Sequence, residues 1–131
     1  MFEKIGFEIN IKNLVQQMKI TNDFFITCEI DYFNSLKNTE EIQLFRVIQE
    51  ALTNIIKYSN AHAAKVTILE NSKSIYVEIK DNGIGFNVEE KLKSKKSFGI
   101  HSIIERIHSI NGNVNFISNK NGTIIKIKIK K

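Results

Sequence analysis

The stretch SIYVEIKDNGIGF, residues 74–86, decides the fold that we expect for this chain. Apolar residues stand at every second position of its first half, so they share one face of an extended strand. Asp81 continues that apolar face, and Gly83 and Gly85 follow it closely. A carboxylate at the end of a buried face is costly unless it meets a hydrogen-bond donor. The stretch therefore predicts a core strand whose last side chain serves a binding site.

The two glycines do not match either common phosphate-binding loop. A dinucleotide fingerprint needs G-x-G-x-x-G, and Val88 stands where the third glycine belongs; the Gly-Lys-Ser/Thr of a P-loop is also missing. We interpret Gly83 and Gly85 as places where the backbone passes closely under a flat ring. Asp81 would then accept a hydrogen bond from an exocyclic amine, such as N6 of adenine. On these residues alone, the alternative is a plain turn with Asp81 capped or salt-bridged.

Helices and strands are predicted on both sides of this stretch. The elements indicated by periodicity are an N-terminal helix within residues 1–20, a strand at 24–30, a long helix at 38–60, strands at 63–70 and 74–81, a helix at 98–110, and strands at 113–118 and 123–130. This order predicts helices on one face of a mixed sheet. Residues 82–97 form a long loop, and such loops inside a compact domain are often lids over a functional site.

Composition and charge are those of one ordinary globular domain. The chain has 131 residues, of which 42% are apolar and 25% charged, and no stretch is apolar enough to span a membrane. We expect the single cysteine, Cys28, to be a free thiol packed in the core. Because the N-terminus does not resemble a signal peptide, we expect a cytoplasmic location. The lysines behind the net charge of +5 lie on a strand face and in a loop without interleaved aromatic residues, so we expect no direct nucleic-acid partner.

The long helix carries a polar set on one side. Glu50, Asn54 and Lys57 fall within roughly 60° of one another around the helix, opposite its apolar stripe. A solvated helix face has the same pattern. The set also offers what a Mg²⁺-bound triphosphate needs: an oxygen ligand for the cation, an amine for the phosphates and an acid beside the reacting group.

Two further positions would close a site around Asp81. Thr123 begins the apolar face of the last strand, and its hydroxyl can reach the same ring edge as Asp81, directly or through water. A structural threonine is the alternative. Gly99 stands near the start of the helix after the loop, where free N–H groups and the helix dipole favour phosphate oxygens.

In this order, these segments resemble the ATP-binding domain of the GHKL superfamily, which includes gyrase-type ATPases, heat-shock chaperones, histidine kinases and mismatch-repair proteins. The matching segments are QEALTNIIKYSNA (49–61) for the N box, DNGIGF (81–86) for the first glycine box, SFGIHSIIERI (97–107) for the second and NGT (121–123) for the last. The likeness covers essentially residues 5–130. It is most similar to sensor histidine kinases whose response regulators have helix-turn-helix outputs.

The resemblance implies an α/β (α+β) two-layer sandwich of the Bergerat type: a mixed, mostly antiparallel sheet, about three helices on one face, and a flexible ATP lid at residues 82–98. By this likeness, Asn54 would bind Mg²⁺, Lys57 would touch phosphate and Asp81 would hold the adenine amine. Glu50 would polarise the attacking imidazole, or serve as the base for water in an ATPase relative. The residues that would shape the pocket and its lid are Gly83, Gly85, Phe98, Gly99, Ile100 and Thr123.

Kinases of this kind pass the γ-phosphoryl group of ATP to a histidine on a separate dimerisation helix, and then to an aspartate of a response regulator. His62, His101 and His108 lack the acidic neighbour and helical context of an acceptor. We therefore expect the dimerisation helices, and any link to a membrane, upstream of residue 1. Ser97 and Ser102 replace glycines that the subfamily usually has, which bears on how the lid closes.

Two other functions stay open at this point. One is a stand-alone serine kinase of the anti-sigma-factor type, which shares the fold. The other is a nucleotide-binding interaction module without turnover, and the intact set of Glu50, Asn54 and Asp81 argues against it.

Overall fold

The structure, a computed structural model, describes residues 6–94 and 98–131. Its elements in chain order are α2 (Phe7–Asn22), β1 (Phe25–Asp31), α3 (Asn38–Tyr58), β2 (Ala63–Glu70), β3 (Ser74–Asp81), α4 (Val88–Lys93), α5 (Phe98–His108), β4 (Gly112–Asn119) and β5 (Gly122–Lys130). Predictions for residues 1–5 and 95–97 fall outside the described part of the chain.

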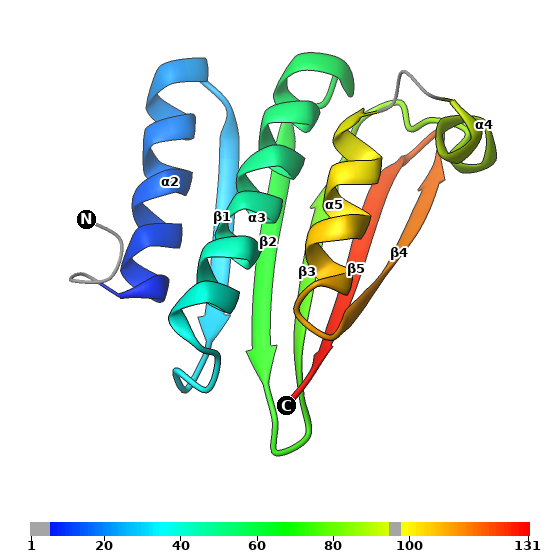
Figure 1. The fold of residues 1–131 in the computed structure, drawn as a ribbon. Helices are drawn as coiled ribbons and strands as arrows, with labels where there is room; N and C mark the ends of the chain where they lie inside the picture. The colour runs from blue at the N-terminus through cyan, green and yellow to red at the C-terminus, as the bar shows by residue number, and fades with distance from the viewer. Residues whose placement is uncertain (1–5, 95–97) are drawn as a thin grey trace.

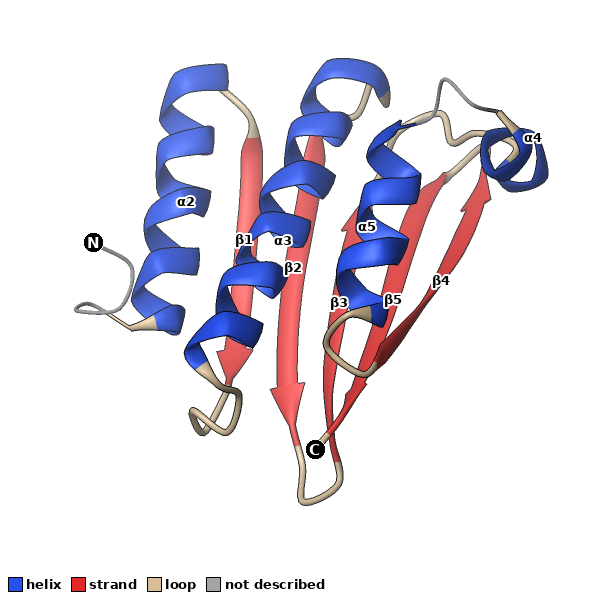
Figure 2. Ribbon diagram, in the orientation of Figure 1, coloured by secondary structure: helices blue, strands red, loops and turns tan. Residues whose placement is uncertain are grey.

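The five strands form one sheet in the order β1-β2-β3-β5-β4 (Figure 1). β1 and β2 are parallel, whereas the other three neighbouring pairs are antiparallel. Helices α2, α3 and α5 lie side by side on one face of this sheet (Figure 2). The predicted two-layer α/β sandwich, with a mixed and mostly antiparallel sheet, is therefore confirmed.

The core lies between the sheet and these three helices, and the alternation along each strand decides which side chains enter it. In β3, every second residue from Ile75 to Asp81 is buried, and in β5 the same holds from Thr123 to Ile129. The buried apolar residues of α3 are Leu44, Val47, Ile48, Ala51, Leu52 and Ile55. Cys28 packs against this core half-buried, as predicted for a core thiol. Both buried strand rows thus end in a polar side chain.

One end of the sandwich gathers the ends of several elements. β3 ends there at Asp81, β5 begins there at Gly122, and β4 ends there at Asn119. α3 ends and α5 begins at the same end, at the top of the view in Figure 1. Segments that are far apart in the sequence therefore meet around the end of β3.

The main difference from the predicted elements lies in the loop at 82–97. It contains α4, whose first turn is capped by Asn87; the Asn87 side chain accepts from the backbone N–H of Glu90 at 3.0 Å. None of the residues of α4 is buried, and so short a helix shows no apolar periodicity from which it could have been predicted. The other helix and strand bounds shift by a few residues at most, as for β1, which begins at Phe25. Among the described residues, no helix is both long and apolar enough to cross a bilayer.

Candidate functional site

Asp81 ends β3 as a buried carboxylate, only 5% exposed. Its Oδ1 accepts from the backbone N–H of Gly83 at 2.7 Å, and the backbone of Thr123 also donates to it. Burial raises the pKa of Asp81 above its ordinary value, and the two hydrogen bonds offset that rise only in part. The acid therefore does lie at the end of a buried face, as its position in the strand predicts.

A cavity of about 690 Å³ opens over Asp81, between α3, α5, the loop after β3 and the adjoining ends of β4 and β5. The predicted site residues that line it are Glu50, Asn54, Asp81, Gly85, Gly99, Ile100 and Thr123. Apolar side chains, among them Phe116 and Ile125, form much of the remaining wall. The cavity thus joins an apolar chamber to a few polar groups, which is the usual composition of a small-molecule site.

Glu50 and Asn54 meet the start of α5 at Gly99. A Cβ added at Gly99 would lie 2.5 Å from Asn54 Nδ2 and 2.9 Å from Glu50 Oε1, so any larger residue there would displace the ends of these two side chains. Both residues are half-buried, and Ala51 and Ile55 beside them line the same cavity. The prediction that they lie opposite the apolar stripe is therefore wrong: Glu50 and Asn54 flank the stripe, at the seam between α3 and α5.

Of the two lysines near the cavity, Lys91 lines it and Lys57 does not. Lys57 is exposed and is not among the residues that line it, whereas Lys91, on α4, does line it. A phosphate contact by Lys57 stays a prediction. Lys91 escaped notice in the sequence because it belongs to the lysine-rich run EEKLKSKK, which has the composition of a solvated loop.

Ser118 and Thr123 form a hydroxyl pair beside Asp81. Ser118 Oγ lies 2.7 Å from Thr123 Oγ1, across the register of β4 and β5, and it accepts from the backbone N–H of Phe86 at 2.8 Å. Thr123 is 5% exposed and lines the cavity, whereas Ser118 is half-buried behind it. Sequence reasoning missed Ser118, because a serine near a strand end gives no signal of its partner on the next strand.

Gly83 and Gly85 allow the chain to pass its own backbone closely. A Cβ at Gly83 would collide with the carbonyl of Ser59, and one at Gly85 would collide with the carbonyl of Asn119. Gly85 also has a φ of +73°, which favours glycine. Their near neighbours are the backbone of Ser59, just after α3, and of Asn119, at the end of β4, and of the two glycines only Gly85 lines the cavity. That both pass under a bound ring stays a prediction.

The second glycine segment is described only in part. Ile100 is 8% exposed and lines the cavity, while Phe98 is the first residue of α5. Ser97 lies outside the described residues, and Ser102 is half-buried in α5 without lining the cavity. The effect of these two serines on lid closure stays a prediction.

The three histidines lie apart from the floor of the cavity. His62 is exposed just before β2, and His108 is exposed at the end of α5. His101 Nε2 lies 3.3 Å from the carbonyl oxygen of Ser94. Within the described residues, no carboxylate pairs with any of the three. That none of the three is the phosphoacceptor stays a prediction.

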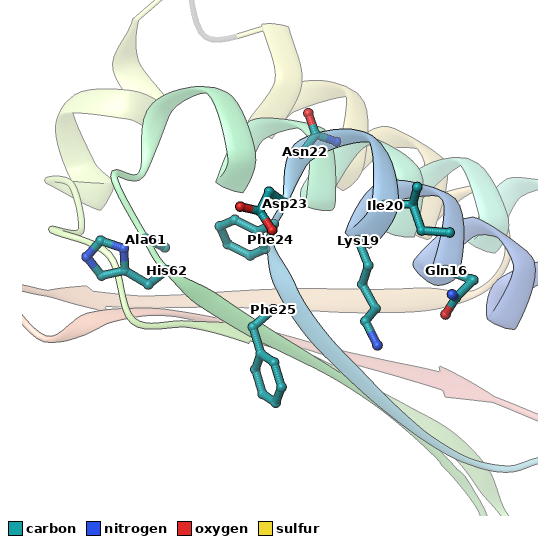
Figure 3. Close-up of a pocket in the computed structure, with 9 residues that line it drawn as sticks. All are labelled: Gln16, Lys19, Ile20, Asn22, Asp23, Phe24, Phe25, Ala61 and His62. Carbon is teal, nitrogen blue, oxygen red and sulfur yellow. The ribbon is translucent and has the colours of Figure 1, made fainter.

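A second hollow lies at the junction of α2 and β1 (Figure 3). Lys19, Ile20, Asp23, Phe25 and His62 are among the side chains that border it. None of the residues predicted for the site borders this hollow, and it holds no buried acid. We therefore place the functional site in the cavity over Asp81.

Oxygen donors for a hard cation stand on one side of that cavity. No group of three or more His, Cys, Asp and Glu side chains in the described ranges could hold a metal ion by itself. The amide oxygen of Asn54 and the carboxylate of Glu50 are of the type that Mg²⁺ prefers, but two such ligands leave most of its coordination sites for other oxygens. The donor set therefore fits a Mg²⁺ ion that arrives with a phosphorylated ligand.

One family profile matches residues 39–131, from the first turn of α3 to the end of the chain, and it is described as "Histidine kinase-, DNA gyrase B-, and HSP90-like ATPase". The chain belongs to this family. The matched range contains every residue that lines the cavity over Asp81, from Glu50 to Ile125. The resemblance to the GHKL superfamily is thereby confirmed, and with it the assignment of the cavity to an ATPase-family domain.

Among individual proteins, curated proteins that are named sensor proteins are similar to the chain over most of its length. Sensor protein VraS of Staphylococcus aureus (strain COL) is 34% identical over 119 residues, which cover 90% of this chain and 33% of VraS. VraS of Staphylococcus haemolyticus is 33% identical with the same coverage. The chain thus spans about a third of the length of these curated relatives.

Solved structures of histidine kinases share the fold. Acinetobacter baumannii histidine kinase AdeS superposes with a TM-score of 0.79 and 18% identity, over 95% of this chain and 64% of that one. The histidine kinase domain of the Erythrobacter litoralis EL346 blue-light activated histidine kinase superposes with a TM-score of 0.77 and 13% identity, over 90% of this chain and 61% of that one. At these identities the likeness shows the fold alone, and it agrees with the family assignment.

Proposed function

We propose that this chain is the ATP-binding catalytic domain of a sensor histidine kinase. It would bind Mg-ATP and donate the γ-phosphoryl group to a histidine on a separate dimerisation helix, for relay to a response regulator. The observation that carries this proposal is a single cavity with a buried acceptor, Asp81, at its floor and with Glu50 and Asn54 at its side. Similarity to sensor proteins over 90% of the chain supports it.

The floor of the cavity suits an adenine ring. The Asp81 carboxylate, held by the backbone N–H of Gly83, is an acceptor for the exocyclic amine. The hydroxyl of Thr123 lies beside it for the neighbouring ring nitrogen. Phe116 and Ile125 supply apolar surface for the ring faces. Guanine would instead present its carbonyl oxygen to the carboxylate, which repels it.

The side of the cavity at the α3–α5 seam suits the phosphates. Asn54, with its amide oxygen, would hold Mg²⁺, which supplies positive charge against the phosphate oxygens. Lys91 lines the cavity and Lys57 lies exposed nearby on α3, so both are candidate phosphate contacts. Gly99, in the first turn of α5, also lines the cavity, and free N–H groups at a helix start favour phosphate oxygens.

Glu50 is the residue that we assign to the transfer step. The attacking imidazole nitrogen forms a bond to the γ-phosphorus, the bond from that phosphorus to the bridging oxygen breaks, and ADP leaves. The Glu50 carboxylate, half-buried one turn before Asn54, would hold the proton on the other imidazole nitrogen and so make the attacking nitrogen more nucleophilic. The dimerisation helices, the response regulator and a cytoplasmic location are part of this proposal.

A chimera with one of the relatives tests the proposal. The matched third of VraS would be replaced by this chain, and the purified chimera would be incubated with γ-labelled ATP and Mg²⁺. We expect label that is lost in acid and kept in alkali, as for a phosphorylated histidine, and we expect Glu50→Gln to abolish it. Lys128→Ala, on the open face of β5, is the matched control that should keep it.

Other outcomes point to the other two functions. Acid-stable label on a serine would favour a serine kinase. Label that never appears, although Mg-ATP still raises the melting temperature of the isolated chain, would favour an interaction module without turnover. A chain that Mg-ATP does not stabilise at all would contradict the proposed function.

A further inference from the structure

Ser118 stands behind the cavity wall and contacts both the floor of the site and the loop above it. Its Oγ lies 2.7 Å from Thr123 Oγ1 and accepts from the backbone N–H of Phe86 at 2.8 Å. A Cβ added at Gly85 would lie 2.9 Å from the same oxygen, so the root of the loop presses closely onto the end of β4. One hydroxyl therefore joins the end of β4, the start of β5 and the loop after β3.

The direction of the hydrogen bond between the two hydroxyls has two alternatives. A hydroxyl has one hydrogen to donate and two lone pairs that accept. The Phe86 N–H occupies one lone pair of Ser118. If Ser118 donates to Thr123, the Ser118 hydrogen is used and the Thr123 hydrogen is left for the cavity. If Thr123 donates, the Ser118 hydrogen has no acceptor among its described partners, and Thr123 offers the cavity lone pairs only.

The first alternative matches adenine. The Watson–Crick edge of adenine presents a donor, the N6 amine, next to an acceptor, N1. The Asp81 carboxylate accepts from the amine, so the next group along the wall must donate if it contacts N1 directly. Thr123 is that group. While the 2.7 Å hydrogen bond between the two hydroxyls is kept, Thr123 can donate to N1 only if Ser118 is the donor of that bond, because Thr123 has a single hydrogen.

We propose that Ser118 is a positioning residue for base recognition: by donating to Thr123 Oγ1, it turns the Thr123 hydroxyl into a donor toward N1 of adenine. This inference rests on the proposed function, since it concerns the same nucleotide site. Ser118 touches no ligand in this arrangement. It acts through Thr123, and the backbone N–H of Phe86 holds its oxygen in place.

The test uses two nucleotides that differ at N1 alone. In 1-deaza-ATP a C–H group replaces N1, while the exocyclic amine that Asp81 would bind is kept. Calorimetric titration of the 131-residue chain in Mg²⁺ gives both dissociation constants for each variant. We expect wild type to bind ATP about tenfold more tightly than 1-deaza-ATP, because a tenfold ratio corresponds to the net free energy of about one hydrogen bond.

Three substitutions of Ser118 separate positioning from packing. Ser118→Ala should reduce the preference for ATP to about twofold or less by weakening ATP alone, because the N1 contact is already absent from 1-deaza-ATP. Ser118→Thr should restore the wild-type preference. Ser118→Cys, with a weak S–H donor of similar size, should fall between them, and it serves as the second test if the alanine variant does not fold.

The outcomes that overturn the inference are distinct from those that overturn the proposed function. Equal weakening of both nucleotides in Ser118→Ala would mean that Ser118 only holds the loop. An unchanged preference in the alanine and cysteine variants would mean that Thr123 donates without it. Either result leaves the proposed function standing, whereas a wild-type chain that binds neither nucleotide overturns both. Asn115→Ala, on the exposed face of β4, is the control and should change neither constant.

Discussion

At the scale of single residues, the buried carboxylate of Asp81 lowers the stability of the folded chain at neutral pH. Its carboxylate is buried at the end of β3 with backbone donors at Gly83 and Thr123, and burial keeps its pKa above the ordinary value of 3.8. The folded state therefore binds this proton more tightly than the unfolded state does. The stability that Asp81 contributes is complete below pH 3.8 and is lost as the pH rises through the raised pKa. At neutral pH the charged carboxylate is a cost that a bound ligand would offset.

Asp81→Asn tests this account of the residue. The amide removes the buried charge but keeps an oxygen for the N–H of Gly83, so at neutral pH and without nucleotide we expect a melting temperature equal to or above that of wild type. Mg-ATP at about 100 times its dissociation constant should stabilise wild type by roughly 2.7 kcal/mol and leave the stability of the variant unchanged. Thermal melting followed by circular dichroism measures both. A variant that ATP still stabilises fully would remove Asp81 from the site.

At the scale of elements, the short helix α4 brings a cation to the cavity, whereas the long helix α3 does not. Asn87 caps α4 at its start, and the backbone N–H of Ser94 bonds back to the carbonyl of Glu90 at 3.0 Å at its end. His101 of α5 contacts the carbonyl of Ser94, so α4 is attached to its neighbour. Lys91 lines the cavity from this helix, while Lys57 on α3 points to solvent.

The two lysines form a matched pair for mutation. We expect Lys91→Ala to weaken ATP binding about tenfold and AMP binding little, because an ammonium near the outer phosphates acts on groups that AMP lacks. Lys57→Ala should weaken ATP binding less than Lys91→Ala does. Titration of both variants with ATP and AMP measures the difference. A larger loss of ATP affinity in Lys57→Ala than in Lys91→Ala would indicate that Lys57, the residue predicted from the sequence, is the main phosphate contact.

At the scale of the whole molecule, the end of the sandwich opposite the site holds an ion pair between a buried carboxylate and an exposed lysine. The side chain of Glu70, at the end of β2, is 0% exposed, and its Oε2 lies 2.7 Å from Lys131 Nζ, just after β5. Its Oε1 accepts from the backbone N–H of Phe33 at 2.8 Å. Burial by itself would raise the pKa of Glu70, but the hydrogen bonds from Lys131, Phe33 and Ser35 outweigh it and hold the pKa below 4.5.

Lys131→Met should destabilise the fold without affecting the site. The change leaves the Glu70 carboxylate buried with one partner fewer, so we expect the free energy of unfolding to fall by about 1–3 kcal/mol at pH 7. Because the folded pKa of Glu70 lies below the unfolded value, its contribution is present above pH 4.5 and is lost as the pH falls through the lowered pKa. The gap between variant and wild type should therefore shrink in acid.

Urea unfolding at several pH values measures this effect. The stabilisation by Mg-ATP should be equal in Lys131→Met and wild type, because the ion pair lies at the far end of the sheet from Asp81 (Figure 1). An ATP effect that changes with Lys131 would show that the two ends are coupled.

The sequence by itself determined the strands, the main helices and the buried position of Asp81. Each follows from a local period: two residues along β3 and β5, and 3.6 along α3. The order of the motifs also determined the family.

Only the tertiary structure decided which of these side chains share a cavity. Glu50 and Asn54 were placed opposite the core by their period, yet the close approach of α5 at Gly99 puts them at its edge. Ser118 gained its role from Thr123 on the next strand, and Lys91 gained its place from α4, which has no periodic signal. The physical reason is the same in each case: a repeat assigns a side chain to one face of its own element, whereas its neighbours depend on how distant elements pack.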